Sequence, residues 1–320
     1  MFTVTEIRTG TQPLQVREEL LTGHRCKISP GRLNRGIDTP YHPQDIQENC
    51  PFCRERIFSV TPVFPDGKRI CRGESITVPN LFPFGEWHTV TVITSRHVVD
   101  TFSPGEIADA LSGQSESLLK AEGYKSINWN YLPSSGASIA HPHLQGLADR
   151  RAPANAERYL VAGHRYLMKQ GRPYWEDLRS FESGSSRYLF GDELFWYAHP
   201  VPLGEREVRC LLPIATIEEF TPYIETFAED LLRIIDMYRR LGTYAFNISV
   251  FFDKKKEKNG FSSFCSIISR INPNAISMSD SAFMERLHLE PVILTLPEDL
   301  ADFFRSEHCY SRAKSQSRII

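Results

Sequence analysis

The chain has 320 residues, enough for a large core and two domains of ordinary size, and its formal net charge is −2, so nothing attracts it to nucleic acid or to an anionic membrane. No basic segment followed by an apolar stretch begins the chain and no apolar run could cross a bilayer, which predicts a cytoplasmic protein that acts on small molecules. Seven scattered cysteines, an odd number, fit a reducing compartment better than a disulfide framework.

The first predicted turn carries two arginines. A short strand after Leu21 leads into Ser29-Pro-Gly-Arg32-Leu-Asn-Arg35, with the arginines three residues apart. Guanidinium groups so placed can each bind phosphate oxygens through two hydrogen bonds. A solvated basic loop is the alternative interpretation of this turn.

Cys50-Pro-Phe-Cys53 has the spacing of two ligands of a tetrahedral zinc site. A redox pair is the alternative, but it would need a long helix after the second cysteine, and the residues that follow do not supply one. No second pair of this spacing exists, so the other two ligands must be histidines. We expect them to be His97, at the end of a strand over residues 89–96, and His141.

A helix and a strand precede the segment that we interpret as the reaction centre. Ser103-Pro-Gly-Glu106 combines an N-cap, a first-turn proline and a capping-box acid, which predicts a helix to about Ala121. Ile127, Trp129 and Tyr131 then predict a strand. The glycine and serines of Asn130-Tyr-Leu-Pro-Ser-Ser-Gly136 predict a turn at which the backbone comes close to a ligand.

The reaction centre itself is Ser138-Ile-Ala-His-Pro-His-Leu-Gln145. In an extended segment His141, His143 and Gln145 share one face, and Pro142 keeps the backbone out of a helix. A histidine whose second ring nitrogen is held by an acceptor is a nucleophile suited to phosphorus. The alternative is an ordinary alternating strand with two buried histidines.

An internal repeat indicates a duplication. Phe82-Pro-Phe-Gly-Glu86 recurs as Val201-Pro-Leu-Gly-Glu205, residues 90–93 recur as 209–212, and residues 127–130 recur as 245–248. We therefore expect an α+β fold of two tandem duplicated domains, each an antiparallel sheet with packed helices.

The two halves differ in chemistry. Thr221-Pro222 opens a second helix, but residues 262–270 contain no histidine where the first half has His-Pro-His. We expect residues 1–165 to form the catalytic domain with the zinc site, and residues 166–320 to form a degenerate repeat.

Taken together, these motifs resemble galactose-1-phosphate uridylyltransferase and its relatives in the histidine-triad superfamily, from Ser29 to about Arg270. The resemblance implies that His143 is the nucleophile and that Ser138 and Gln145 are phosphate donors. It also implies a structural Zn²⁺ on the two cysteines and two histidines named above. The substrate-binding residues that it implies are Arg32, Arg35, Asn80, Phe82, Asn130 and Gly136.

The resemblance further implies a homodimer that moves UMP or AMP between a nucleoside diphosphate sugar and a sugar phosphate or phosphate, through a nucleotidyl-histidine. No second metal is expected, because residues 264–270 replace the Trp-Gln-x-His-x-His segment common in the family's second half. A phosphorylase or hydrolase acting on nucleotide sugars or dinucleoside polyphosphates is an alternative within the superfamily. A zinc-stabilised nucleotide-binding protein without catalysis is the other alternative.

Overall fold

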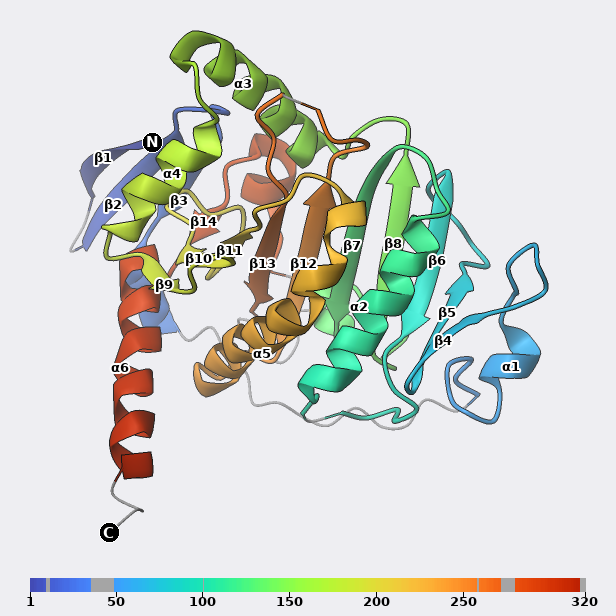
Figure 1. Cartoon of the computed structure of the whole chain (residues 1–320). Helices are drawn as coiled ribbons and strands as arrows, with labels where there is room; N and C mark the ends of the chain where they lie inside the picture. Colours follow the sequence, from blue (N-terminus) through green and yellow to red (C-terminus); the bar gives the residue numbers. More distant parts are fainter. Residues whose placement is uncertain (10–11, 36–48, 100, 258, 272–279, 317–320) are drawn as a thin grey trace.

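The computed structural model describes residues 1–9, 12–35, 49–99, 101–257, 259–271 and 280–316. Within these ranges, ten strands form one antiparallel sheet in the order β4-β5-β6-β8-β7-β12-β13-β11-β10-β9 (Figure 1). The strands are β4 (Ile70–Arg72), β5 (Ser75–Pro79), β6 (Trp87–Val92), β7 (Tyr124–Tyr131), β8 (His143–Asp149), β9 (Tyr188–Phe190), β10 (Phe195–Ala198), β11 (Val208–Leu211), β12 (Ala245–Phe252) and β13 (Phe264–Arg270).

A smaller sheet lies at the β9 end of the large one. Its strands are β1 (Phe2–Thr9), β2 (Gln12–Glu19), β3 (Arg25–Ile28) and β14 (Val292–Ile293), in that order. Only the β3–β14 pair is parallel. Buried side chains of β3 and β14 pack against Val201, which fixes this sheet to the second half of the chain.

The helices pack on both faces of the large sheet, because one apolar core includes Trp196 of β10 and another includes its neighbour Tyr197, whose side chain points to the opposite face. They are α1 (Ile57–Val60), α2 (Pro104–Leu118), α3 (Ala154–Gln170), α4 (Tyr174–Ser183), α5 (Ile224–Arg240) and α6 (Pro297–Gln316), with short 3-10 helices η1 (Pro30–Arg35), η2 (Pro133–Ser135), η3 (Ile217–Glu219) and η4 (Thr221–Tyr223) and a π-helical turn η5 (Met284–His288). None of the helices in the described ranges is long and apolar enough to cross a membrane.

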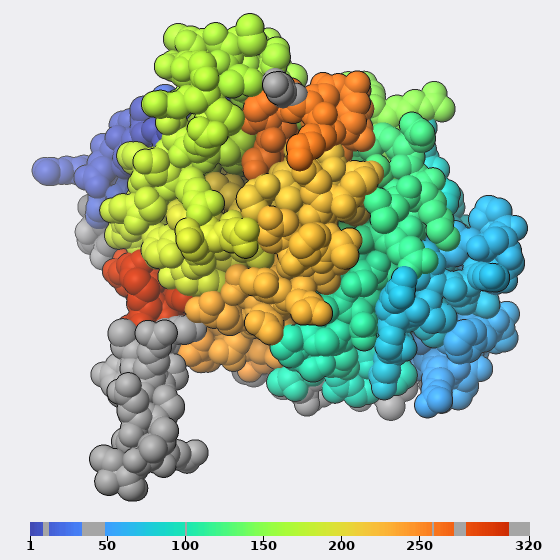
Figure 2. Space-filling view, in the orientation of Figure 1, coloured from blue at the N-terminus to red at the C-terminus, as the bar shows by residue number. Residues whose placement is uncertain are grey.

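The predicted capping box of α2 is confirmed. The Ser103 hydroxyl accepts from the Glu106 backbone N–H, and the Glu106 carboxylate accepts from the Ser103 N–H. The buried residues of α2 and α5 belong to one apolar core with β7 and β12. Figure 2 shows these two helices side by side over that face of the sheet.

The two halves of the sheet repeat one strand pattern. In the first half, Val92 lies opposite His143 and Val90 lies opposite Gln145. In the second half, Leu211 lies opposite Phe264 and Arg209 lies opposite Ser266. Because residues 90–93 correspond to 209–212, this pairing places Phe264 at the counterpart of His143.

The expected register of the third repeated strand is wrong by three residues. Asn128 lies opposite Gln145 in the first half, and Ser249 lies opposite Ser266 in the second. Residues 127–130 therefore correspond to 248–251 and not to 245–248. The two halves also share one sheet, and the proposed boundary at residue 165 falls within α3, so the division into two domains stays a prediction.

Two strand predictions were too long. Strand β6 ends at Val92 and not near residue 96, so His97 lies in the loop beyond it. Strand β8 begins only at His143, because the residues from Ser138 to Pro142 form bends. His143 and Gln145 thus share a strand face, whereas His141 precedes the strand.

Candidate active site and metal cluster

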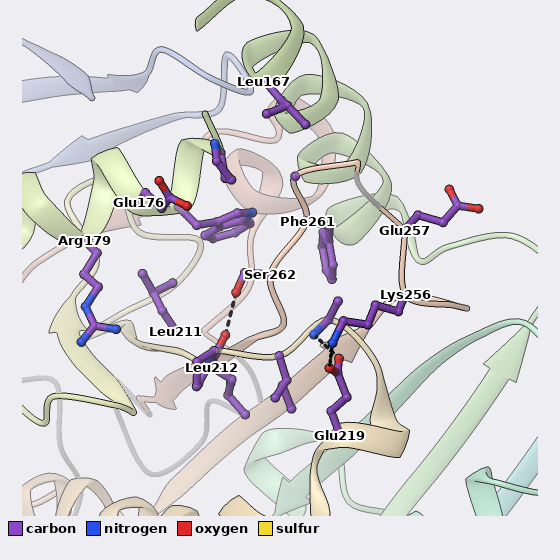
Figure 3. Close-up of a pocket in the computed structure, with 16 residues that line it drawn as sticks. Leu167, Glu176, Arg179, Leu211, Leu212, Glu219, Lys256, Glu257, Phe261 and Ser262 are labelled. Atoms are coloured by element: carbon purple, nitrogen blue, oxygen red, sulfur yellow. Dashed lines mark hydrogen bonds and ion pairs between the residues drawn. The ribbon is translucent and has the colours of Figure 1, made fainter. Parts of the chain in front are cut away.

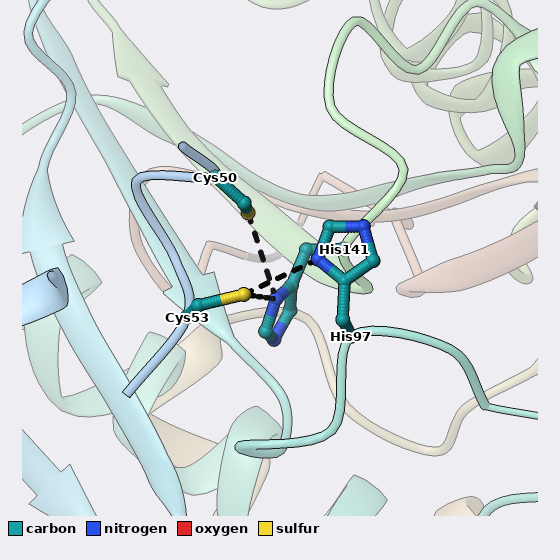
Figure 4. A group of neighbouring side chains, drawn as sticks. All are labelled: Cys50, Cys53, His97 and His141. Carbon is teal, nitrogen blue, oxygen red and sulfur yellow. Dashed lines mark hydrogen bonds between the residues drawn. The ribbon is translucent and has the colours of Figure 1, made fainter. Parts of the chain in front are cut away.

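Four predicted metal ligands meet at the ends of β6 and β8 (Figure 4). Cys50 and Cys53 come from the loop before α1, His97 from the loop after β6, and His141 from the bend before β8. Their ligand atoms all lie within 4.8 Å of one another. The Sγ of Cys53 is 3.3 Å from Nδ1 of His97 and 3.8 Å from Nδ1 of His141.

The donor set fits a tetrahedral metal ion. Ligand bonds of about 2.0–2.3 Å give tetrahedron edges of roughly 3.6 Å, close to these separations. His141 donates from Nε2 to the Thr94 carbonyl at 2.8 Å, so its Nδ1 lacks a proton and is free for a metal. Burial and the neighbouring Cys50 raise the pKa of the Cys53 thiol to about 11, so two adjacent thiolates require a cation.

The same chain of hydrogen bonds fixes His143. Its Nδ1 donates to the His141 carbonyl at 2.8 Å, which leaves Nε2 with a lone pair. The side chain is 6% exposed. Burial lowers the pKa of His143, although the bond to the His141 carbonyl opposes this, so the ring is uncharged near neutral pH. A neutral imidazole with one nitrogen held by an acceptor can act as a nucleophile.

Phe52 connects the cysteine loop to both histidines. Its ring centroid lies 5.2 Å from that of His143 and 6.2 Å from that of His141, in edge contacts. Cys50, Phe52 and Ile57 pack into one apolar cluster with residues of β5 and β6. A metal ion on the cysteines would therefore hold the wall against which His143 packs.

Gln145 lies two residues beyond His143 on the same face of β8. Its Oε1 lies 3.0 Å from Nε2 of His88, a buried residue of β6. Asn80 lies 3.0 Å from the same ring through Nδ2, so the loop after β5 joins this network.

The remaining predicted site residues occupy different surroundings. Gly136 has a φ of +93° with open space around it, and Ser138 is exposed. Asn130 on β7 accepts a hydrogen bond from Asn247 of β12 at 2.6 Å. Phe82 is 80% exposed and stands next to the half-buried Asn80.

The structure does not bring Arg32 to His143. Arg32 is exposed on η1, directly after β3. Strand β3 lies in the small sheet at the β9 end, while β8 lies towards the other end of the large sheet (Figure 1). The Arg35 side chain lies outside the described part of the chain, and a phosphate-binding role for both arginines stays a prediction.

In the second half of the chain, buried aromatic and charged side chains stand where the first half has its proposed reactive groups. Phe264 occupies the counterpart of His143, and its ring and that of Tyr159 lie 5.4 and 5.1 Å from the guanidinium of Arg209. Arg209 also donates to the Glu207 carboxylate at 2.7 Å. Because these residues are all buried, they fill the space that corresponds to the first half's reactive face.

A cavity of about 560 Å³ lies in the second half and does not border His143 (Figure 3). Its wall includes Ser262, which corresponds to His141 because Phe264 corresponds to His143. The described residues that line it include no histidine or cysteine. The expectation that this half binds no metal stays a prediction.

Sequence reasoning missed three contributors to the site. They are Phe52, the carbonyl of Thr94, and His88, which lies one residue before the predicted start of its strand. His88 carried a usable signal, because alternation along residues 88, 90 and 92 places it on the sheet face that carries His143 and Gln145. The Thr94 contact is made by a backbone carbonyl, so the type of residue at this position does not indicate it.

Comparisons with known proteins agree with this architecture. No protein-family model matches the chain. An uncharacterized protein of Archaeoglobus fulgidus is 28% identical to it, over 94% of this chain and 92% of that protein.

Solved structures with this fold include enzymes. The chain resembles an ADP-glucose phosphorylase from Arabidopsis thaliana with bound ADP-glucose, with a TM-score of 0.72 at 16% identity, over 92% of this chain and 98% of that one. A GalT-like protein from Arabidopsis thaliana gives a TM-score of 0.71 at 16% identity, over 91% and 98% of the two chains. A uridylyltransferase gives 0.68 at 17% identity, over 91% and 97%. These likenesses confirm the expected fold.

Proposed function

We propose that the chain is a nucleotidyltransferase of the histidine-triad type, in which His143 carries a UMP or AMP group from a nucleoside diphosphate sugar to a sugar phosphate or to phosphate. The observation that carries this proposal is the bond from Nδ1 of His143 to the His141 carbonyl. That bond leaves Nε2 as the reactive nitrogen. The likeness in fold to a uridylyltransferase and to an ADP-glucose phosphorylase supports the same reaction class.

The reaction proceeds in two displacements. Nε2 of His143 attacks the α-phosphorus of the donor, the bond to the bridging oxygen breaks, and the sugar phosphate leaves with the electron pair. A phosphate oxygen of the acceptor then attacks the same phosphorus, and the phosphorus–nitrogen bond breaks to restore the imidazole. The His141 carbonyl accepts the hydrogen bond from Nδ1–H throughout and so stabilises the positive ring of the intermediate.

Hydrogen-bond donors around His143 stabilise the phosphate oxygens that gain negative charge in the transition state. We assign this role to the Gln145 amide, the Ser138 hydroxyl and the backbone near Gly136; removal of one such donor typically costs about a hundredfold in rate. Zn²⁺ on Cys50 and its three partner ligands would be structural and hold His141 in place. Asn80, Phe82 and Asn130 stay the proposed binding residues for the nucleotide.

The acceptor decides the exact activity. If inorganic phosphate takes the nucleotide, the protein is a phosphorylase, as the name of one structural neighbour suggests for that protein. If water takes it, the protein is a hydrolase. All three activities share the nucleotidyl-histidine, which is therefore the species to detect first.

The test is the intact-protein mass after incubation with UDP-glucose, UDP-galactose, ADP-glucose or diadenosine tetraphosphate. We expect a gain of one uridylyl or adenylyl group that disappears in His143→Ala and persists in His164→Ala, a change at an exposed histidine of α3. Adding sugar phosphate or phosphate then discharges the adduct and identifies the acceptor. A folded protein that forms no adduct and releases no product with any donor contradicts the proposal.

A further inference from the structure

His88 is a buried histidine whose ring is held from both sides. On one side its Nδ1 lies 3.3 Å from the Phe84 backbone nitrogen, and Nδ2 of Asn80 lies 3.3 Å from Nδ1 and 3.0 Å from Nε2. On the other side its Nε2 lies 3.0 Å from Oε1 of Gln145. It lies outside the metal cluster and on the strand next to the proposed nucleophile.

The backbone decides which ring nitrogen carries the proton. The Phe84 N–H can only donate, so Nδ1 of His88 must accept and lacks a proton. The Asn80 amide faces the ring through Nδ2, because its Oδ1 accepts from the Phe82 N–H at 2.9 Å, but it lies near both ring nitrogens, so the Phe84 N–H is the contact that assigns the tautomer. Burial lowers the pKa of His88, although its hydrogen bond to Gln145 and the charge of Asp149 oppose this, so the ring is neutral near pH 7. The contacts with the Phe84 N–H and with Gln145 then place its one proton on Nε2.

This tautomer orients the Gln145 side chain. Nε2–H of His88 donates to Oε1, so the amide NH₂ group of Gln145 must point away from His88. No described residue accepts from that NH₂ group. The opposite rotation of the amide would place an acceptor against phosphate oxygens and a donor against the Nε2–H of His88, which is unfavourable on both sides.

We propose that His88 is a positioning residue, which fixes the Gln145 amide so that its NH₂ group donates to the phosphate that His143 attacks. This role rests on the proposed function. His88 acts through Gln145 and need not touch the substrate.

The first test is a double-mutant cycle on the rate of nucleotidyl-histidine formation at saturating donor. His88→Phe keeps a ring but removes the donor, and we expect it to lower the rate by roughly ten- to a hundredfold while donor affinity changes by less than about threefold. His88→Gln retains an N–H near the position of Nε2 and should restore most of the rate. In the Gln145→Ala background, His88→Phe should have no further effect.

A second measurement does not depend on turnover. A long-range ¹H–¹⁵N spectrum of the unliganded protein should show the His88 ring in the Nε2–H form, with the signals assigned by their loss in His88→Gln. His164→Phe, at an exposed position, serves as the control for rate and for unfolding.

The outcomes separate the two proposals. A wild-type rate in His88→Phe, equal rate losses in both backgrounds of the cycle, or an Nδ1–H ring each refutes the role of His88 and leaves the proposed function standing. Absence of any adduct or turnover in the wild-type protein refutes the proposed function, and the positioning role with it.

Discussion

Glu19 provides a quantitative test of the buried network in the second half. It is 3% exposed, and Tyr159 donates to both of its carboxylate oxygens at 2.9 Å. Burial raises the pKa of Glu19, but the hydrogen bond and charge of His199, with help from Arg209 and Thr22, outweigh it and lower the pKa from 4.5 to about 2. The folded state therefore binds this proton less readily than the unfolded chain.

Each pH unit between these two values contributes about 1.36 kcal/mol, so ionised Glu19 stabilises the fold by about 3 kcal/mol at pH 7. That contribution is complete above pH 4.5 and disappears as the pH falls towards 2. Glu19→Gln should lower the free energy of unfolding by about this amount at pH 7, and by roughly half as much at pH 3.

The assay is urea unfolding of wild type and Glu19→Gln at both pH values. Glu18→Gln is the matched control, because Glu18 is the neighbouring residue of β2 and its side chain points to the other face of the strand. If the difference between wild type and Glu19→Gln is the same at pH 7 and pH 3, the carboxylate charge is not what stabilises this network. If no difference exists at pH 7, the network does not stabilise the fold.

Two further substitutions test the first half. Cys53→Ser should abolish stoichiometric metal binding, measured by elemental analysis of the purified protein, and lower the free energy of unfolding by several kcal/mol, whereas Cys71→Ser, at an exposed cysteine, should change neither. Equal metal content in both variants would exclude the proposed cluster. Gly146→Ala places a methyl group against the buried Gln114 amide and should cost about 1–3 kcal/mol, whereas Gly163→Ala, with open space in α3, should stabilise by about 0.5–1 kcal/mol. Thermal unfolding that ranks the two glycine variants the other way would contradict the packing described for β8.

The sequence predicted the elements whose signals are local. The α2 capping box depends on two residues three apart, and the two cysteines of the metal cluster are likewise three residues apart. Strand ends and strand registers that depend on contacts between distant residues were predicted less accurately. Strand β8 begins further along the chain than predicted, because the backbone bends at His141 and its carbonyl accepts a hydrogen bond from the His143 ring. The residue types do not indicate this contact.

The alternation of apolar residues carried a signal for the register that the motif comparison did not use. In β7 the buried apolar residues Ile127, Trp129 and Tyr131 alternate with polar ones, and in β12 the main apolar series is at the even positions 246–252. A shift by an odd number of residues exchanges the two faces of a strand, so the expected match set the apolar face of β7 against the more polar face of β12. The pairing with β8 and β13, where His143 and Phe264 take equivalent places, fixes the register.

The pairing of β7 with β12 limits where the chain can be divided into separately expressed fragments. Seven consecutive residue pairs, from Lys125 with Phe252 to Tyr131 with Phe246, join the two halves. A fragment that ended between the halves would expose a long, apolar strand edge with unpaired N–H and C=O groups, which is a template for aggregation. Truncated versions should therefore be insoluble when expressed alone, and a complementary pair of fragments should become soluble only when co-expressed.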